Sequence, residues 1–227
     1  MFKPNTLFNL LVVFSGMIFL SCQNEQNPIE SIPVSRQTEI SKATIPFGAT
    51  IDSAAFFINV TTANGEEVTI HRITNYWEEM FVTWNNVING FDTNIEGSFV
   101  PTTPGWSSVD VTSLVNSWID QTYPNNGILL KESSPDTIQI YTSKEEGHSP
   151  YLKVWWTLNG SHGYDSTSAI ADTYIRSDSG FINSGSALEL ITGWQDTTER
   201  QTLVKFEFEI VQTSGCTHGY GYWKTHS

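Results

Sequence analysis

The sequence has few charged residues, and positive charge is especially scarce. Charged residues make up 15% of the 227 positions, with 11 lysines and arginines against 24 aspartates and glutamates, a formal net charge of −13. A chain with this balance repels phosphate backbones, so we expect no nucleic-acid partner. The low charge, the 13% aromatic content and the many small polar residues also argue against helical bundles, coiled coils and disorder.

Motifs of familiar catalytic chemistry are absent from the sequence. It has no glycine-rich phosphate loop, no G-x-S-x-G and no H-E-x-x-H. Neighbouring residues on a strand point to opposite faces, so neither Glu78/Glu79 nor Glu145/Glu146 supplies by itself the facing carboxyl pair of a glycosidase. A pair from separate segments, such as Glu78 and Glu145, would have to meet in space to supply it. We therefore predict no enzyme and no obligatory cofactor.

The first residues are typical of a targeting segment. Lys3 is the only charge before an apolar run from residue 7 to 20, which is short for a membrane span. The run ends in Phe19-Leu20-Ser21-Cys22, which resembles a bacterial lipobox. We predict a signal peptide over residues 1–21, a lipid on Cys22, a tether over residues 22–35, and attachment to the bacterial cell envelope at the outer membrane or cell surface. An ordinary cleaved signal is the alternative.

Cysteine is nearly absent, since Cys22 and Cys216 are the only two. If Cys22 is acylated, Cys216 has no intramolecular partner and no disulfide framework stabilises the fold. The folded state must then depend on burial of aromatic and aliphatic side chains.

Strand signals recur at short intervals and predict an all-β fold. The strongest single helical signal is the spacing of Val111, Leu114, Val115 and Trp118, which predicts a short helical turn at one end of a sheet. We predict a jelly-roll-like antiparallel β-sandwich over residues 36–158, with at most short helical turns. The expected strands cover residues 51–60, 67–73, 106–111, 127–132, 137–142 and 151–158.

The remaining chain is harder to divide. Residues 159–168, rich in Gly, Ser, Thr and Asp, predict a linker. Strand signals at 171–175, 187–190 and 201–211 follow, but a segment of this size is too small for a sandwich of its own. Residues 169–213 are thus either a partial second unit or strands that complete the first sandwich out of order. Unpaired strand edges are a liability, which favours the second alternative.

Several motifs occur in a fixed order across residues 44–157. They are Ile51-Asp52-Ser53-Ala54, Trp77-Glu78, Val82 to Asn86, Asp110 to Trp118, Asn125 to Lys131, Ser143-Lys144-Glu145 and Pro150 to Val154. In this order they resemble the DNRLRE-domain family, which is related to disaggregatase-type repeats and to carbohydrate-binding module family 96. The "ADTYI" opening of that family comes late here, at Ala171 to Ile175.

The resemblance implies a non-catalytic, extracellular module that binds polysaccharide. A structural or adhesive surface domain without glycan binding is the alternative. The tail over residues 214–227 resembles a "C-T-x-x-x-G-Y-W-K-x-H" motif of assorted bacterial extracellular proteins, to which we assign no chemistry.

Aromatic residues are the first candidates for sugar contacts. Trp77, Trp84 and Trp118 lie in the motifs that define the family, and we predict that they belong to the core. On the strand at 151–158, Tyr151, Lys153 and Trp155 alternate with apolar residues and should share an outward face. We predict these three as ligand-binding residues. Tyr141, opposite Ile138 and Ile140 on its strand, is predicted to join them.

A calcium site is a weaker possibility. Asp92, Asp110 and Asp136 are the candidate ligands, because Ca²⁺ takes six to eight oxygen ligands and is common in jelly-roll binding modules. No EF-hand-like spacing is present.

Overall fold

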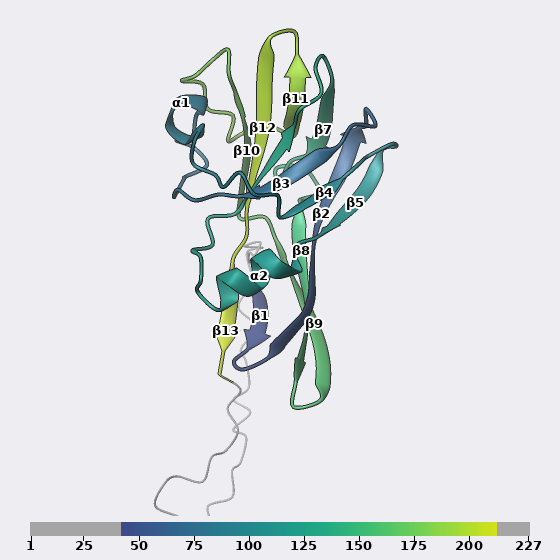
Figure 1. The fold of residues 1–227 in the computed structure, drawn as a ribbon, viewed down its shortest axis with the longest axis vertical. Coiled ribbons are helices and arrows are strands. Elements are labelled where there is room, and N and C mark those ends of the chain that lie inside the picture. Colours follow the sequence, from purple (N-terminus) through teal and green to yellow (C-terminus); the bar gives the residue numbers. More distant parts are fainter. Residues whose placement is uncertain (1–41, 213–227) are drawn as a thin grey trace, which may run out of the picture. The chain divides into compact units, whose positions relative to one another are not determined.

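A computed structural model describes residues 42–212 of the chain (Figure 1). The predicted signal peptide, Cys22, the tether and the C-terminal motif lie outside the described residues. The described part is dominated by strands, which confirms the predicted all-β sandwich. None of its helices is long and apolar enough to cross a membrane.

The helices are α1 (Trp84–Val87) and α2 (Thr112–Ile119), and α2 carries the helical spacing seen in the sequence. The strands are β1 (Ala43–Pro46), β2 (Thr50–Thr62), β3 (Val68–Arg72), β4 (Gly97–Phe99), β5 (Gly105–Asp110), β6 (Ile128–Glu132), β7 (Ile138–Thr142), β8 (Tyr151–Leu158), β9 (Ser161–Ser168), β10 (Ala171–Arg176), β11 (Glu189–Gln195), β12 (Thr198–Lys205) and β13 (Phe208–Val211).

The order of strands in the sheet differs from their order in the sequence, although three pairs (β3 and β4, β8 and β9, β11 and β12) are neighbours in both. Its main path runs β4-β3-β6-β12-β11-β7-β2-β8-β9, with β10 paired to β12 and β5 paired to β2. Every pairing in this sheet is antiparallel. The long strand β2 connects its neighbours, because it pairs with β8 in its first half, with β5 in its second half and with β7 near its end.

The main core lies between strands from distant parts of this path. Alternate residues of β2, such as Phe56, Ile58 and Val60, pack with Ile70 of β3 and Leu130 of β6. Leu114, Val115 and Trp118 of α2 are buried in the same cluster, which explains their helical spacing. Burial of these side chains supplies the main favourable term in folding.

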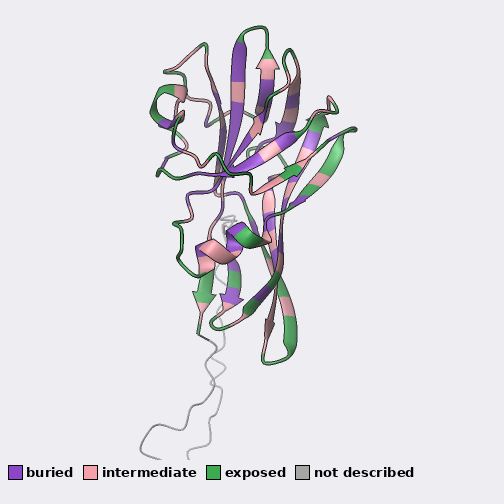
Figure 2. Ribbon diagram, in the orientation of Figure 1, coloured by how far each residue is buried: buried purple, intermediate pink, exposed green. Residues whose placement is uncertain are grey.

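A second, smaller core covers the other face of β6 and β12. Leu129 and Leu203 point into this second core, whereas their neighbours Ile128, Leu130 and Val204 face the main core. Both strands are therefore buried on both faces (Figure 2). Trp77 fills this second core, and its Nε1 donates a hydrogen bond to the Asn126 carbonyl oxygen at 2.8 Å. The family motif around Trp77 therefore covers the outside of the sandwich instead of filling its centre.

The strands after residue 169 are part of the same sheet as the strands before residue 158. In β12, residues 202–204 pair with residues 128–130 of β6, while β11 pairs with both β12 and β7. Ile175 of β10 lies in the second core beside Trp77. The apolar surface of the early strands is thus covered by the late ones.

The segment predicted as a linker contains strand β9, so that expectation was wrong. Asn159 and Gly160 both adopt positive φ, at 51° and 80°, which is the backbone of a tight type I′ hairpin turn between β8 and β9. The inward-facing positions of β9 include Gly163, where the Trp156 ring crosses the backbone so closely that a Cβ would meet it at 2.3 Å. A strand with so few apolar residues lacks the alternation that marks strands in a sequence.

The described unit is closed by the parallel pair β1 and β13, in which Ile45 lies opposite Ile210 (Figure 1). The predicted strand over 201–211 is therefore two strands: β12 ends at Lys205, and β13 begins at Phe208. Trp118 of α2 stacks on Phe208 with ring centroids 6.5 Å apart. Both ends of the described chain lie at the same end of the unit.

Removal of the late strands should unfold the rest. A chain that ends at residue 168 lacks Leu203 and Val204, which face the two cores, and leaves β6 and β7 with unpaired edges. We expect it to lose cooperative thermal unfolding measured by circular dichroism. The single change Leu203→Ala in the full chain should cost about 2–5 kcal/mol of unfolding free energy. A cooperative transition in the shortened chain would show that residues 42–168 fold alone.

Candidate functional site

An aromatic face covers the outside of strands β5, β2, β8 and β9. Tyr151 and Trp155 point outward from β8, since Leu152 and Val154 between them are buried in the main core. Tyr151 stacks on Phe57 of β2 with ring centroids 4.5 Å apart and planes at 4°. Trp106 of β5 meets the Tyr151 ring edge-on at 5.3 Å. We call Phe57, Trp106, Tyr151, Trp155 and Tyr164 the aromatic face.

Lys153 lies within the aromatic face, between Tyr151 and Trp155 on β8. Trp155 lies directly opposite Tyr164 of β9. The Lys153 ammonium is 4.9 Å from the ring centroid of Trp155 and 4.2 Å from that of Tyr164. Such cation–π contacts at an exposed site contribute about 0.5–1 kcal/mol each. The structure thus places Tyr151, Lys153 and Trp155 on one outward face.

Tyr141 does not join this face, and its assignment to the surface was wrong. It is fully buried in the main core, and Gln139 on the same side of β7 is fully buried as well. Ile138 and Ile140 are the residues of β7 that point outward and are only partly covered. Strand β7 carries large apolar residues on both faces, so alternation in the sequence does not identify its inner face.

The other tryptophans are divided between the two cores and the surface. Trp77 and Trp118 are buried and Trp84 is half-buried against the second core, as expected of residues that define a fold. Trp106 is 48% exposed and Tyr164 is 65% exposed. These two are therefore accessible aromatic groups that the sequence analysis did not select.

A polar groove of about 610 Å³ adjoins the aromatic face. Asn59 and Thr61 follow Phe57 on the same side of β2, and His148 lies 6.1 Å from the Trp106 ring while also lining the groove. The floor comes from β2, β7 and β11, in which Glu189 is directly opposite Thr142. The lining residues are Asn59, Thr61, Thr142, Glu146, His148, Tyr174, Ala187, Leu188, Glu189 and Ile191.

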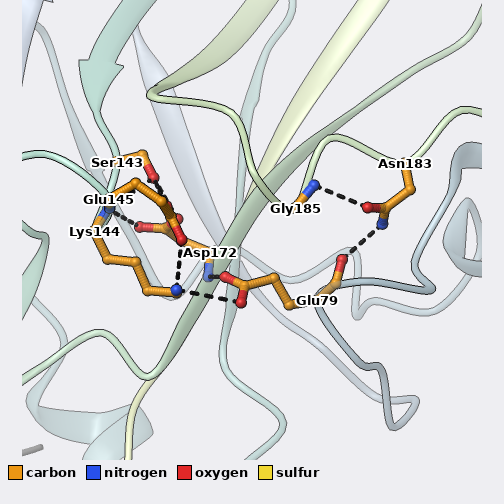
Figure 3. A network of polar contacts seen from close by, with 7 residues as sticks. All are labelled: Glu79, Ser143, Lys144, Glu145, Asp172, Asn183 and Gly185. Atoms are coloured by element: carbon orange, nitrogen blue, oxygen red, sulfur yellow. Dashed lines mark hydrogen bonds and ion pairs between the residues drawn. The ribbon is translucent and has the colours of Figure 1, made fainter.

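A partly buried network of polar contacts connects the segments that line this groove (Figure 3). Asp172, at the start of β10, accepts hydrogen bonds from the Lys144 backbone N–H at 2.7 Å and from Ser143 Oγ at 2.9 Å. The Asp172 backbone N–H donates to Glu79 Oε1 at 2.7 Å. The Lys144 ammonium lies 2.6 Å from Glu145 and 3.3 Å from Glu79.

The same network continues to Asn183 and Gly185, in the loop before Leu188. Asn183 Nδ2 donates to the carbonyl oxygens of Glu79 and Val82 at 2.6 and 2.7 Å, and Asn183 Oδ1 accepts from the Gly185 N–H. A Cβ on Gly185 would lie 2.4 Å from the Glu79 carbonyl oxygen, so only glycine permits this approach. The network thereby fixes the loop before Glu146, the strand that carries Tyr174 and the loop before Leu188.

Burial is the largest influence on the acidic groups of the network. It raises the pKa of Asp172 to about 7, although the hydrogen bonds from Lys144 and Ser143 act in the opposite direction. Burial also raises the pKa of Glu79. For Lys144, burial lowers the pKa, but the contacts with Glu145 and Glu79 outweigh it and the pKa is raised. For Glu145, burial raises the pKa, but the contacts with Lys144 and Ser143 outweigh it and the pKa is lowered.

The serine hydroxyl gives a structural reason for a proton on Asp172. Ser143 Oγ contacts both Asp172 and Glu145, yet a hydroxyl has one hydrogen to donate. If Asp172 is protonated, it donates to Ser143 Oγ, and Ser143 then donates to Glu145. This arrangement satisfies all three groups, which a fully ionised network cannot do.

The three aspartates proposed for calcium have local partners. Asp92 pairs with Arg72 at 2.6 Å and accepts from the Asn94 N–H, and Asp110 accepts from the backbone and hydroxyl of Thr112. Asp136 lies in an exposed turn at φ 57°. Within residues 42–212, the carboxylates that gather are those of Glu79, Glu145 and Asp172, and the Lys144 ammonium already lies among them.

The carboxylates that meet in space differ from the candidate pair Glu78 and Glu145. Glu79, and not Glu78, approaches Glu145, while Glu78 accepts a hydrogen bond from the Tyr76 hydroxyl. Asp172, the third member, is 1% exposed. The Asp172 carboxyl therefore has no access to a glycosidic bond, whereas Glu79 is half-buried and Glu145 is exposed.

The protonation of Asp172 should make stability depend on pH. Its folded-state pKa lies above its ordinary value, so the folded protein holds a proton that the unfolded chain releases. The stabilisation is complete below about pH 4 and is lost as pH rises through about 7. Asp172→Asn keeps one acceptor for Lys144 and one donor for Ser143. We expect this variant to be more stable than wild type above pH 7, by on the order of 2 kcal/mol.

Thermal or urea unfolding between pH 4 and 8 measures this difference. Asp136→Asn, which removes a carboxylate from an exposed turn, is the matched control for the loss of one negative charge. Equal pH profiles for wild type and Asp172→Asn would mean that Asp172 is ionised in the folded protein.

Comparison with known protein families gives one finding. The model of a family described as carbohydrate-binding module family 96 matches residues 42–155, which is half of the chain. The match includes β1 to β7, the part of β8 up to Trp155, and most of the aromatic face. No curated protein and no solved structure matches the chain.

Proposed function

Because this chain belongs to carbohydrate-binding module family 96, we propose that its aromatic face binds a polysaccharide without cleaving it. The observation that carries the proposal is the set of outward aromatic rings from Tyr164 to Trp106: ring contacts hold Phe57, Tyr151 and Trp106 together, and the Lys153 ammonium lies over the rings of Trp155 and Tyr164. Flat aromatic faces suit the C–H faces of sugar rings, and rings that are already fixed lose little conformational entropy on binding.

The length of the face favours a polymer over a single sugar. Trp155 lies opposite Ser53 of β2 and Trp106 lies opposite Asn59, six residues further along the same strand. Six residues of a strand span about 20 Å. A ligand that contacts both tryptophans is therefore longer than one sugar unit, and affinity should rise with chain length.

The leader of the chain supports a further proposal about location. The lipobox-like run from Phe19 to Cys22 supports a lipid-anchored protein of the bacterial cell envelope.

Loss of either outward-facing tryptophan of the aromatic face should weaken glycan binding. Trp106→Ala and Trp155→Ala each remove one platform from the face, and we expect about a tenfold loss of affinity for each, the equivalent of about 1.4 kcal/mol. The measurement is retention on insoluble polysaccharides and a glycan array. Phe47→Ala, which removes an exposed aromatic ring outside the aromatic face, is the matched control.

Three outcomes separate the possible roles. Retention that falls in both tryptophan variants but not in the control supports the proposal. Retention unchanged in both variants would place the ligand elsewhere. No retention of wild type on any glycan would favour a structural or adhesive domain without glycan binding.

The anchor is tested separately by partition into detergent. The full-length chain expressed in a bacterium should enter the Triton X-114 phase, because an acyl chain contributes about 0.8 kcal/mol per buried CH₂. Cys22→Ser removes the acceptor and should move the protein to the aqueous phase. Equal partition of the two chains would contradict lipidation at Cys22.

A further inference from the structure

Two fully buried polar side chains, those of Thr192 on β11 and Gln139 on β7, face the interior of the sandwich side by side. They are directly opposite each other in the antiparallel pair of these two strands. Both point inward, because Leu190 and Tyr141, two residues away on the same strands, belong to the main core. Directly opposite residues have Cβ atoms about 4.5–5.5 Å apart, so the two side chains are within reach of each other.

Each of these side chains has an oxygen atom without a hydrogen-bond partner in the part of the chain that the structure describes. The atoms are Thr192 Oγ1 and Gln139 Oε1, and both are closed off from solvent. The nitrogen of the Gln139 amide is held in place, since Nε2 donates to the Glu66 carbonyl oxygen at 3.0 Å. Native proteins rarely leave buried polar atoms unpaired, because each one has lost its hydration without compensation. The pair therefore needs a chemical explanation.

A buried carboxylate, that of Glu132 on β6, lies at the same place. Glu132 is 1% exposed, and within residues 42–212 no lysine, arginine or histidine forms an ion pair with it. A Cβ on Gly193, the residue after Thr192, would lie 3.0 Å from Glu132 Oε2. Burial raises the pKa of Glu132, while hydrogen bonds from neighbouring side chains, that of Gln139 among them, act in the opposite direction. A carboxylate with a raised pKa is a stronger base.

The Tyr141 hydroxyl adds a donor to the group. It is buried with the pair and has no hydrogen-bond partner among residues 42–212. Burial raises the pKa of Tyr141, although the neighbouring Thr192 hydroxyl acts in the opposite direction, so the phenol keeps its hydrogen. A donor fixed at this position stabilises negative charge that develops on a nearby carbonyl oxygen.

We propose that Thr192 and Gln139 form an intramolecular ester cross-link between β11 and β7, with Glu132 as the general base. Thr192 Oγ1 attacks the side-chain carbonyl carbon of Gln139, and Glu132 takes the hydroxyl proton as the new C–O bond forms. Tyr141 donates to the resulting oxyanion. The C–N bond then breaks and Glu132 returns the proton to the leaving nitrogen, so one ammonia is released and nothing is oxidised or reduced.

The interior of the sandwich favours this reaction over hydrolysis. Two groups held in contact react far faster than the same groups free in solution. Thr192, Gln139 and Glu132 are shielded from water, which protects the ester once it has formed. The released ammonia is diluted into the surroundings, and this draws the reaction toward the ester.

The cross-link joins the family-matched part of the chain to the later strands. Gln139 lies within the matched residues 42–155, whereas Thr192 lies beyond them. A covalent bond between β7 and β11 restricts the unfolded chain and so stabilises the fold, as a disulfide does in other proteins. Residues 42–212 contain no cysteine, so the ester supplies this stabilisation by other chemistry. Its formation does not depend on glycan binding.

Mass spectrometry of the full-length protein tests the cross-link directly. Tryptic cleavage puts Gln139 in the peptide of residues 132–144 and Thr192 in the peptide of residues 177–200. We expect both to be recovered as one species, about 17 Da lighter than their sum because one ammonia is lost. Hydroxylamine, which cleaves esters under conditions that leave amides intact, should separate them. Neither peptide contains an Asn-Gly pair, so succinimide formation at such a pair does not explain this loss of mass.

Three variants assign the reacting groups. Thr192→Val keeps the shape of the side chain without the nucleophile, and Gln139→Met removes the carbonyl group, so each should abolish the joined species. Glu132→Gln should slow its formation by about 100-fold. The matched control is Thr202→Val, because Thr202 is also a fully buried threonine but its hydroxyl already donates to the Ile191 carbonyl oxygen at 3.0 Å. The control should retain the cross-link.

Thermal unfolding gives a second measurement. Replacement of an unpaired buried hydroxyl by a methyl group ordinarily leaves the melting temperature unchanged or raises it. With the cross-link present in wild type, Thr192→Val should instead lower the melting temperature by roughly 10 °C.

Two results would overturn the inference: separate, unmodified peptides from folded wild type, or a joined species that persists in Thr192→Val. A buried water would then be the partner of the unpaired atoms. Either result leaves the proposed function intact, and a protein that binds no glycan can still carry the cross-link.

Discussion

The burial of β6 and β12 on both faces is the constraint from which the rest of this structure follows. Ile128, Leu130 and Val204 face the main core, so Leu129 and Leu203 must point outward, where water would meet them. The segment around Trp77 covers them and forms the second core. This cover places Glu79 beside the start of β10 and so brings the acidic network together. The need to cover Leu129 and Leu203 therefore determines the position of Glu79, and with it the position of the polar network beside the groove.

The buried network is costly, and its geometry shows how the cost is reduced. Burial of an ionised carboxylate without full compensation is unfavourable, and Asp172 is almost wholly removed from solvent. A proton on Asp172 removes one negative charge and supplies the hydrogen that Ser143 needs to bond both neighbours. Lys144 offsets the charges of Glu79 and Glu145. The network thus holds the loop before Glu146, the start of β10 and the loop before Leu188 in one arrangement.

Most of the fold could be predicted from the sequence, because alternation and turn residues are local signals. Strands β2, β8 and β10 and helix α2 lie where their patterns indicate. Strand β9 was missed because Gly163, Asp165 and Thr167 occupy its inner face, and Tyr141 was misplaced because β7 is apolar on both sides. The second core and the groove depend on strands that pair out of order, and no local pattern contains that information.

Family membership and specificity are carried by different parts of this chain. The matched residues 42–155 supply most of the aromatic face, and stacking on such a face discriminates weakly between sugars because most pyranose rings offer a C–H surface. Discrimination needs hydrogen bonds that a wrong ligand leaves unmade, since an unpaired buried polar group costs more than a lost contact. The groove beside the aromatic face carries polar groups, and Tyr174 and Glu189 among them come from strands beyond the matched segment. Two chains with equal family resemblance but different late strands should therefore prefer different glycans.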